Sequence, residues 1–379
     1  MGAEVQSAPI HIDEEELRDL GARLRRVRWP DREPVADWSQ GAPLDHVQAL
    51  IAHWRDAYDW RRCEAALNAL GPSVTEIDGL DIFFLHIRSK HADAMPLIMT
   101  HGWPGSVIEF LKCVGPLTDP TAHGGQASDA FHLVLPSLPG YGFSAKPRET
   151  GWGAKRIAQA WGVLMQRLGY ARYVAQGGDW GAVVTTAMGL IRPEGLAAVH
   201  LNMPLVVPKE PPANPSPAEA RALAQLDAYR RWDTGYSIQQ MTRPQTLGYG
   251  LADSPVGQAA WIYEKFYAWT DNQGAPETVL SRDELLDNIM LYWLTNTGAS
   301  SARLYWESFR GGLGAVNLDF PAGASVFPKD IYTAPRAWCE RCMPKLIYWN
   351  ELDRGGHFAA FEQPALFVEE VRKCFRLVR

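Results

Sequence analysis

A single aspartate, Asp179, has neighbours that place it at a sharp turn between a strand and a helix. An apolar run, Tyr173 to Ala175, precedes it, and small residues stand two positions before and two positions after it, at Gly177 and Gly181. Such small residues let backbone approach backbone at a nucleophile elbow. A carboxylate that attacks a saturated carbon forms an ester, which water can still cleave, whereas a serine would form an ether. Asp179 therefore predicts displacement at saturated carbon, as in epoxides or alkyl halides, rather than acyl transfer.

A second motif could supply the amide groups that stabilise an oxyanion. The segment from Thr100 to Gly105 follows an apolar stretch and contains two glycines, which let a backbone bend close to a ligand. Pro104 has no N–H to donate, so the useful donor is the amide of Trp103. The second donor would be the amide of Trp180, directly after the nucleophile. An ordinary strand-end turn would have a similar composition, but beside an elbow the segment predicts an oxyanion hole.

His357 is the candidate base that would activate water. It lies in the loop from Arg354 to Phe358, after the last predicted strand and before the final helix. That position gives the chain order of nucleophile, acid and histidine found in enzymes with such an elbow. An acid would hold the imidazole in one tautomer and stabilise the imidazolium. The candidates for this acid are Asp330, Glu351 and Asp353, and position alone does not choose among them.

The rest of the chain alternates between short apolar strands and amphipathic helices, which is the pattern of an α/β fold. A period of two residues from Val74 to Arg88, with a turn at Asp78-Gly79, predicts a β-hairpin. The later strands are apolar throughout, as in a parallel sheet. These strands are predicted at residues 96–99, 131–135, 173–175, 196–201 and 345–349. Helices in the same part of the chain are predicted at residues 155–168, 182–188, 283–295 and 363–377.

Four segments follow from this pattern. Residues 1–75 are predicted to form helices and loops without a strand, including one helix over residues 45–60. Residues 76–207 are predicted to form the first part of an α/β core, and residues 319–379 the second part. Residues 208–318 begin with a proline-rich linker and are otherwise mainly helical. A helical insertion at this place in a parallel sheet is the layout of a lid over an active site.

Composition limits the classes of function. The chain has 379 residues and a formal net charge of −6, which gives no reason to expect nucleic acid or an anionic membrane as a partner. The first thirty residues carry charged runs, and no apolar run reaches the ~18 residues that span a bilayer, so neither a signal peptide nor a membrane anchor is predicted. The odd number of cysteines, five, favours reduced thiols and a cytoplasmic location. Cys339 and Cys342 form a lone CxxC, which offers two of the ~4 ligands of a structural zinc, so no metal site is predicted.

Taken together, these motifs resemble the microsomal-type epoxide hydrolases of the α/β-hydrolase superfamily, over nearly the whole chain. The N-terminal runs Arg28-Trp29-Pro30 and Tyr58-Asp59-Trp60-Arg61 look like that family's N-terminal domain, which wraps the hydrolase core. Further runs similar to its signatures lie at residues 101–105, 138–144, 177–181, 253–257 and 354–361. The resemblance implies an α/β-hydrolase fold: a mostly parallel central sheet flanked by helices, with a helical lid and an N-terminal wrapping segment.

The resemblance also implies roles for individual residues. Asp179 is then the nucleophile and His357 the base that activates water. The family's acid follows an aromatic-proline pair before the last strand, which selects Asp330. Two lid tyrosines hold and protonate the epoxide oxygen in this family, and they match Tyr236 and Tyr305.

The implied activity is hydrolysis of a small-molecule epoxide to a vicinal diol through an aspartyl ester, without metal or cofactor. Trp103, Trp180 and Phe358 are expected to bind the substrate. Haloalkane dehalogenase chemistry is an alternative that uses the same nucleophile, and a non-catalytic α/β-hydrolase binding protein is another. The resemblance leaves open a homodimer, and a role in detoxification, catabolism or natural-product biosynthesis.

Overall fold

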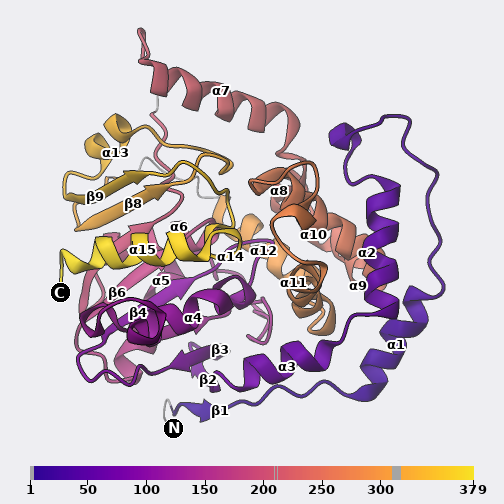
Figure 1. Ribbon diagram of the computed structural model, residues 1–379, viewed down its shortest axis with the longest axis horizontal. Helices are drawn as coiled ribbons and strands as arrows, with labels where there is room; N and C mark the ends of the chain where they lie inside the picture. Colours follow the sequence, from indigo (N-terminus) through magenta and orange to yellow (C-terminus); the bar gives the residue numbers. More distant parts are fainter. Residues whose placement is uncertain (1–3, 209, 211, 310–316) are drawn as a thin grey trace.

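One nine-stranded sheet organises the chain in the computed structural model, which describes residues 4–208, 210, 212–309 and 317–379 (Figure 1). The order of strands across the sheet is β1-β2-β3-β5-β4-β6-β7-β8-β9. The bounds of the strands are β1 (Gln6–Ser7), β2 (Pro72–Ile77), β3 (Leu80–Ile87), β4 (Met95–Thr100), β5 (Phe131–Pro136), β6 (Tyr173–Gly177), β7 (Leu196–Leu201), β8 (Ala322–Val326) and β9 (Leu346–Glu351).

The direction of the strands divides the sheet into two parts. From β5 to β9 every neighbouring pair is parallel, whereas β1, β2 and β3 pair antiparallel at one edge, where β3 joins β5. The predicted hairpin is β2 and β3, because Asp78 and Gly79 both have positive φ, as a two-residue turn between twisted strands requires. Strands β4 to β7 are almost wholly buried, which explains their continuous apolar runs. The predicted mostly parallel α/β sheet is confirmed.

Helices cover both faces of the sheet, and a further group stands beside it (Figure 1). One face carries α4 and α15, which pack against each other, and the other carries α5 and α6. Between β7 and β8 the chain leaves the sheet and forms the helices α7 to α12. The bounds of the helices are α1 (Glu14–Leu24), α2 (Leu44–Asp56), α3 (Trp60–Asn68), α4 (Leu111–Thr118), α5 (Ala154–Arg167), α6 (Trp180–Ile191), α7 (Pro217–Trp232), α8 (Gly235–Thr242), α9 (Pro244–Asp253), α10 (Pro255–Trp269), α11 (Arg282–Leu294), α12 (Gly298–Phe309), α13 (Arg336–Cys342), α14 (Ala359–Glu362) and α15 (Pro364–Arg376).

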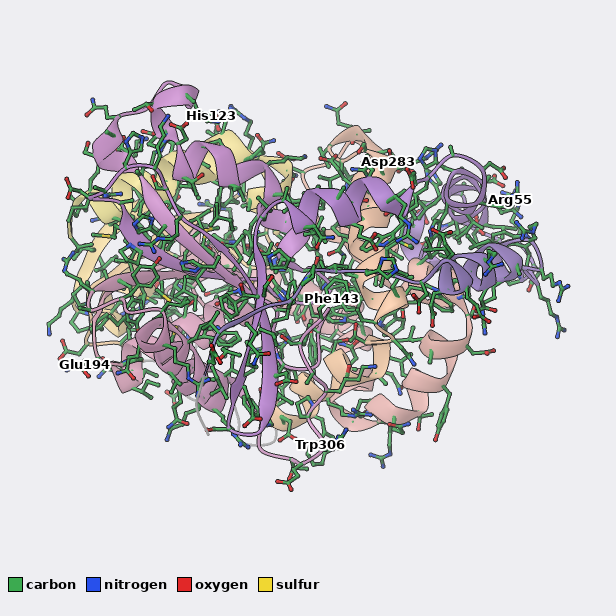
Figure 2. The ribbon with its side chains drawn as sticks, turned by 90° about the horizontal axis from the view of Figure 1, so that it is seen from below. Arg55, His123, Phe143, Glu194, Asp283 and Trp306 are labelled. Atoms are coloured by element: carbon green, nitrogen blue, oxygen red, sulfur yellow. The ribbon has the colours of Figure 1, made fainter. Side chains whose placement is uncertain are left out.

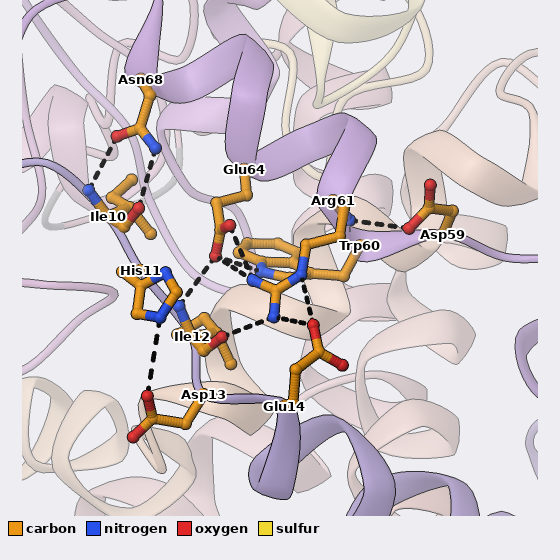
Figure 3. Close-up of polar contacts among 10 residues, drawn as sticks. All are labelled: Ile10, His11, Ile12, Asp13, Glu14, Asp59, Trp60, Arg61, Glu64 and Asn68. Carbon is orange, nitrogen blue, oxygen red and sulfur yellow. Dashed lines mark hydrogen bonds and ion pairs between the residues drawn. The ribbon is translucent and has the colours of Figure 1, made fainter.

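The N-terminal segment is fastened along α3 by a polar network (Figure 3). Asn68 pairs with both backbone groups of Ile10, and the carboxylate of Glu64 accepts hydrogen bonds from the amide of Ile12 and the indole of Trp60. The guanidinium of Arg61 donates to Glu64 and to the carbonyl of Ile12. Because the Glu64 carboxylate is buried and well supplied with donors, this network fixes the segment that links β1 to α1.

The same segment is also tied to helix α11 of the inserted group. His53 of α2 lies 2.7 Å from Asp283 of α11, which faces the N-terminal helices in Figure 2. One turn further along α11, the buried carboxylate of Asp287 accepts hydrogen bonds from Tyr58 and Arg62. The N-terminal helices therefore fix the outer face of α11, and α11 in turn contacts the loop that follows β4.

Two sequence predictions about secondary structure are wrong, and one strand was missed. The helix predicted over residues 45–60 is two helices, α2 and α3, because Asp59 caps a new helix by accepting a hydrogen bond from the amide of Arg61. The first 75 residues do contain strands, since β1 pairs with β2 and β2 begins at Pro72. Strand β8 was not predicted, because its residues are small: a Cβ added at Gly323 would lie 2.2 Å from the sulfur of Cys374 on α15.

The predicted division into segments 1–75, 76–207, 208–318 and 319–379 remains a prediction. Residues 209, 211 and 310–316 of the third segment lie outside the described residues. Across the described residues, no helix combines the length and the apolar character needed to cross a membrane.

Candidate active site

Asp179 occupies a strained turn between β6 and α6. Its backbone has φ of 52° and ψ of −129°, a conformation that non-glycine residues rarely adopt, and it is the residue before the first turn of α6. The turn is possible because its flanking residues are glycines. A Cβ added at Gly177 would lie 2.1 Å from the carbonyl oxygen of Gly181, and one at Gly181 would lie 1.9 Å from the carbonyl oxygen of Thr100. The elbow therefore presents the Asp179 side chain above the end of the sheet.

His357 and Asp330 meet Asp179 from two later loops. Nδ1 of His357 lies 2.7 Å from Oδ1 of Asp330, and Nε2 lies 3.2 Å from Oδ2 of Asp179. Lys329 and Gly356 form a bridge that brings the loop after β8 against the loop after β9. The structure thus brings together the three residues that the sequence placed far apart.

The two other candidate acids lie elsewhere. Glu351 is exposed and its carboxylate accepts a hydrogen bond from the indole of Trp349. Asp353 is exposed as well and forms an ion pair with Arg354. Neither carboxylate is in contact with the imidazole, whereas Asp330 is buried beside it.

The charges around His357 keep its imidazole protonated. Burial lowers the pKa of His357, but the carboxylates of Asp330 and Asp179 outweigh burial and raise the pKa to about 10. Burial raises the pKa of Asp330, and the imidazolium opposes that rise. An imidazolium between two carboxylates is therefore the resting arrangement of this group.

The amide of Trp103 points at the side chain of Asp179. It donates a hydrogen bond of 2.8 Å to Oδ1 of Asp179. The loop that carries it is held from α11, because Asn288 donates to the carbonyl of Pro104 and Tyr292 donates to the carbonyl of Gly105.

Trp180, the other predicted donor, is the first residue of α6. Within the described part of the chain its amide makes no hydrogen bond to Asp179, so its share in an oxyanion hole stays a prediction.

An apolar cavity of about 190 Å³ opens in front of Asp179. Tyr236 of α8 and Tyr305 of α12 both line it, and their rings lie 5.8 Å apart, edge to face. Trp180 contributes to the wall, and its ring packs edge-on against Tyr305 at 4.8 Å. The other residues that line the cavity are Val183, Met203, Leu205, Leu226, Tyr229, Phe309, Ile331 and Tyr332.

The ring of Tyr236 is held between an aromatic and a cationic side chain. Trp103 stacks on it at 4.9 Å with an interplanar angle of 8°. The ammonium of Lys265 lies 4.8 Å from the centre of the same ring, while it pairs with Asp233 at 2.6 Å. Trp103 is therefore placed behind Tyr236 and does not itself line the apolar cavity.

Phe358 does not line this cavity, so its contact with substrate stays a prediction. It is buried against Phe266, with ring centres 4.5 Å apart, and against the ring of His357. It borders instead a separate cavity of about 20 Å³, together with Asp179, His357 and Glu109. That volume suits one water molecule.

Two residues at the site were missed from the sequence. Burial raises the pKa of Glu109 to about 8, with the neighbouring His357 opposing that rise. Glu109 stands three residues after Ser106, a spacing typical of a helix start, so its sequence signal is structural. Tyr229, on α7, places its hydroxyl 3.0 Å from that of Tyr236. No motif surrounds it, and only the meeting of α7 with α8 reveals it.

An aspartate at a strand-to-helix elbow, a histidine beside a buried carboxylate and a group of inserted helices over the mostly parallel sheet define an α/β-hydrolase fold. Comparison with known proteins agrees. Residues 95–239 match the family model of the alpha/beta hydrolase fold, and residues 5–110 match that of the epoxide hydrolase N terminus.

Individual relatives extend the match to the whole chain. A protein of Stigmatella aurantiaca (strain DW4/3-1) named "Putative epoxide hydrolase" is 61% identical over 98% of this chain and 84% of its own length. Epoxide hydrolase 1 of Sus scrofa is 35% identical over 97% of this chain and 88% of its own length. The crystal structure of juvenile hormone epoxide hydrolase from the silkworm Bombyx mori superimposes with a TM-score of 0.92 at 30% identity, covering 100% of this chain and 95% of that one. The chain belongs to the epoxide hydrolase family, as its motifs had indicated.

Proposed function

We propose that this chain converts an epoxide and water into a vicinal diol through an ester on Asp179. The observation that carries the proposal is that two phenol side chains, Tyr236 and Tyr305, line the same cavity as the nucleophile. A phenol can give a proton to an epoxide oxygen, which stays in the product. A halide leaves without taking a proton, so the two tyrosines would not assist cleavage of a haloalkane in the same way.

In the first half-reaction a carboxylate oxygen of Asp179 attacks a ring carbon. The carbon–oxygen bond of the ring breaks, and its electron pair moves to the epoxide oxygen, which takes a proton from Tyr236 or Tyr305. The product is a hydroxyalkyl ester of Asp179. Both tyrosines are buried, and burial raises the pKa of each, which keeps both protonated until that oxygen develops charge.

Ester formation also prepares the base for the second half-reaction. Once Asp179 is an ester, it no longer contributes the negative charge that helps raise the pKa of His357. The imidazolium can then release its proton to solvent and become a base. Asp330 keeps the imidazole in the tautomer whose Nε2 faces the ester.

In the second half-reaction neutral His357 takes a proton from water, which attacks the carbonyl carbon of Asp179. The small cavity shared by Asp179, His357 and Glu109 offers that water a place beside both reacting groups. The amide of Trp103 stabilises the oxyanion that forms, because it already donates to the same carboxylate oxygen. When the intermediate collapses, the departing diol oxygen takes the proton of the added hydroxyl group, and the carboxylate is restored beside the imidazolium.

The cavity also indicates the class of substrate. Among the described residues that line it, Asp179 is the single charged one, and the rest are apolar or aromatic. Its volume of about 190 Å³ is below the ~300–1,000 Å³ of pockets for drug-sized ligands. We therefore expect small, uncharged, apolar epoxides as substrates.

Measuring both products decides between the functions. An aryl epoxide should yield a diol, and a bromoalkane should yield no halide. With enzyme in excess over epoxide in H₂¹⁸O, the first turnover should place the label in Asp179, since water attacks the ester at its carbonyl carbon. Release of halide without diol would establish dehalogenase chemistry. Label in the first diol would exclude the ester. Formation of no diol and no halide would favour a binding protein.

A cytoplasmic location is also proposed. All five cysteines are free thiols, and four of them are buried, which suits a reducing compartment. Fractionation of the source cells tests the location, and sedimentation of the purified protein distinguishes a monomer from a homodimer.

A further inference from the structure

A third tyrosine stands at the acid side of the site. Tyr229 is in the last turn of α7, and its hydroxyl oxygen lies 3.0 Å from that of Tyr236 on the next helix. It lines the cavity that also contains Asp179. Burial raises the pKa of Tyr229 to about 12, and the hydrogen bond with Tyr236 opposes that rise. Tyr229 is thus a neutral phenol held against the hydroxyl of a proposed acid.

The geometry suits a relay of two hydroxyl groups. A phenol has one proton to donate, and its oxygen can accept a hydrogen bond at the same time. When Tyr236 turns its proton toward the epoxide oxygen, its own oxygen can accept a hydrogen bond from Tyr229. A hydrogen bond to an oxygen that is gaining negative charge is stronger than one between neutral groups. The contact therefore gains strength as the epoxide ring opens.

The ring of Tyr236 is covered by packing, so a neighbouring residue can stabilise charge on Tyr236 at its hydroxyl group. Trp103 covers one part of its ring and the ammonium of Lys265 lies over it as well. The charge of Lys265 is balanced by carboxylates of Asp233 and Glu264, at 2.6 and 2.8 Å. Tyr229 is the neutral hydroxyl at that end of Tyr236, 3.0 Å away, and either oxygen can act as the donor; Tyr229 stands on α7 rather than on the helix that carries Tyr236.

We propose that Tyr229 is a positioning residue for epoxide opening, acting through Tyr236; this rests on the proposed function. As the ring carbon–oxygen bond breaks, the epoxide oxygen takes the Tyr236 proton, and the negative charge left on Tyr236 is stabilised by the hydrogen bond from Tyr229. The proton that His357 releases after ester formation replaces the one taken, through solvent. Tyr229 assists formation of the ester and has no part in its hydrolysis.

The test measures the two half-reactions separately. In Tyr229→Phe, single-turnover ester formation should be about tenfold slower, which is the scale of one lost hydrogen bond. The rate of ester breakdown should stay within about twofold. Tyr263→Phe is the matched control. Tyr263 stands on the lid helix α10 and does not line the cavity, and its hydroxyl donates a hydrogen bond to Glu277.

A double variant separates an effect through Tyr236 from a direct one. In a Tyr236→Phe background, the change Tyr229→Phe should cause no further loss, because its acceptor is gone. An equal loss in that background, an equal loss in both half-reactions, or an unchanged rate of ester formation would each overturn the inference. A wild-type protein that forms no diol would instead overturn the proposed function, so the two failures are distinct.

Discussion

The floor and the roof of this site are built in different ways. The floor consists of Asp179, His357, Asp330 and the amide of Trp103, which all follow strands of the sheet. The roof consists of Tyr229, Tyr236 and Tyr305, which stand on the separate inserted helices α7, α8 and α12. The floor is set by turns of the backbone and the roof by packing of side chains. Under the proposed mechanism the roof serves ring opening, the floor serves ester hydrolysis, and Asp179 belongs to both.

The two halves are nevertheless connected at particular points. The amide of His357 donates to the carbonyl of Trp269, at the end of lid helix α10. Helix α11 supports the loop of Trp103 through Asn288. A structural change in the roof can therefore displace residues of the floor. Variants that separate the two halves must remove side-chain groups without breaking these hydrogen bonds.

The largest expected effect comes from breaking the floor alone. His357→Gln removes the base but leaves the roof intact, so ester formation should continue and ester hydrolysis should fall by about 10³-fold or more. Mass spectrometry of the intact protein should show the added mass of the epoxide on nearly every molecule. Multiple turnover at the wild-type rate would contradict the assigned base.

Breaking the roof should give the opposite pattern. Tyr236→Phe combined with Tyr305→Phe removes both acids, and ester formation should slow by about 10²-fold or more. No ester should accumulate, because the intact floor clears it faster than it forms. Rapid-quench measurement of ester and diol checks this, and accumulation of ester would show that these tyrosines act on the floor instead.

A change in the backbone of the floor should have an intermediate effect. A Cβ added at Gly102 would lie 2.2 Å from Oδ1 of Asp179, so Gly102→Ala must displace the nucleophile or the loop. Both half-reactions should slow by about tenfold, since Asp179 belongs to both. The matched control is Gly250→Ala on α9, because a Cβ there meets nothing within 4 Å and this exposed helical residue does not line the cavity. If Gly102→Ala slowed ester formation alone, the expectation would be contradicted, because the change would affect the attack by Asp179 without affecting stabilisation of the oxyanion.

The two halves also differ in how far the sequence could predict them. The strands before Trp103 and Asp179, β4 and β6, are buried and apolar, and the run Leu196 to Leu201 coincides with β7 for the same reason: burial on both faces leaves a continuous apolar signal. Strand β8 left no such signal, because contact with α15 restricts it to small residues such as Gly323. Tyr229 could not be predicted either, since its contact with Tyr236 depends on the angle between two helices. Tyr236 and Tyr305 were found through family resemblance rather than through their spacing.

The smallest expected effect is a shift in the pKa of His357, which links the halves electrostatically. Burial lowers this pKa, and Asp330 and Asp179 raise it to about 10. Asp179→Asn keeps the shape of the nucleophile and removes its charge, as the ester does, so the pKa should fall. Titration of the imidazole by NMR measures the shift, and an unchanged pKa would mean that Asp330 alone sets it.

The same charge predicts how stability depends on pH. Because the pKa of His357 is higher in the folded chain, at about 10, than its ordinary 6.5, its contribution to the free energy of unfolding is complete below pH 6.5 and is lost as the pH rises through 10. In Asp179→Asn, whose folded pKa lies closer to 6.5, that loss should be smaller and should finish at lower pH. Denaturant unfolding of both proteins at pH 6 and at pH 10 measures the difference. An equal loss in the two proteins would mean that Asp179 does not stabilise the imidazolium, and ester formation could not then switch His357 from acid to base.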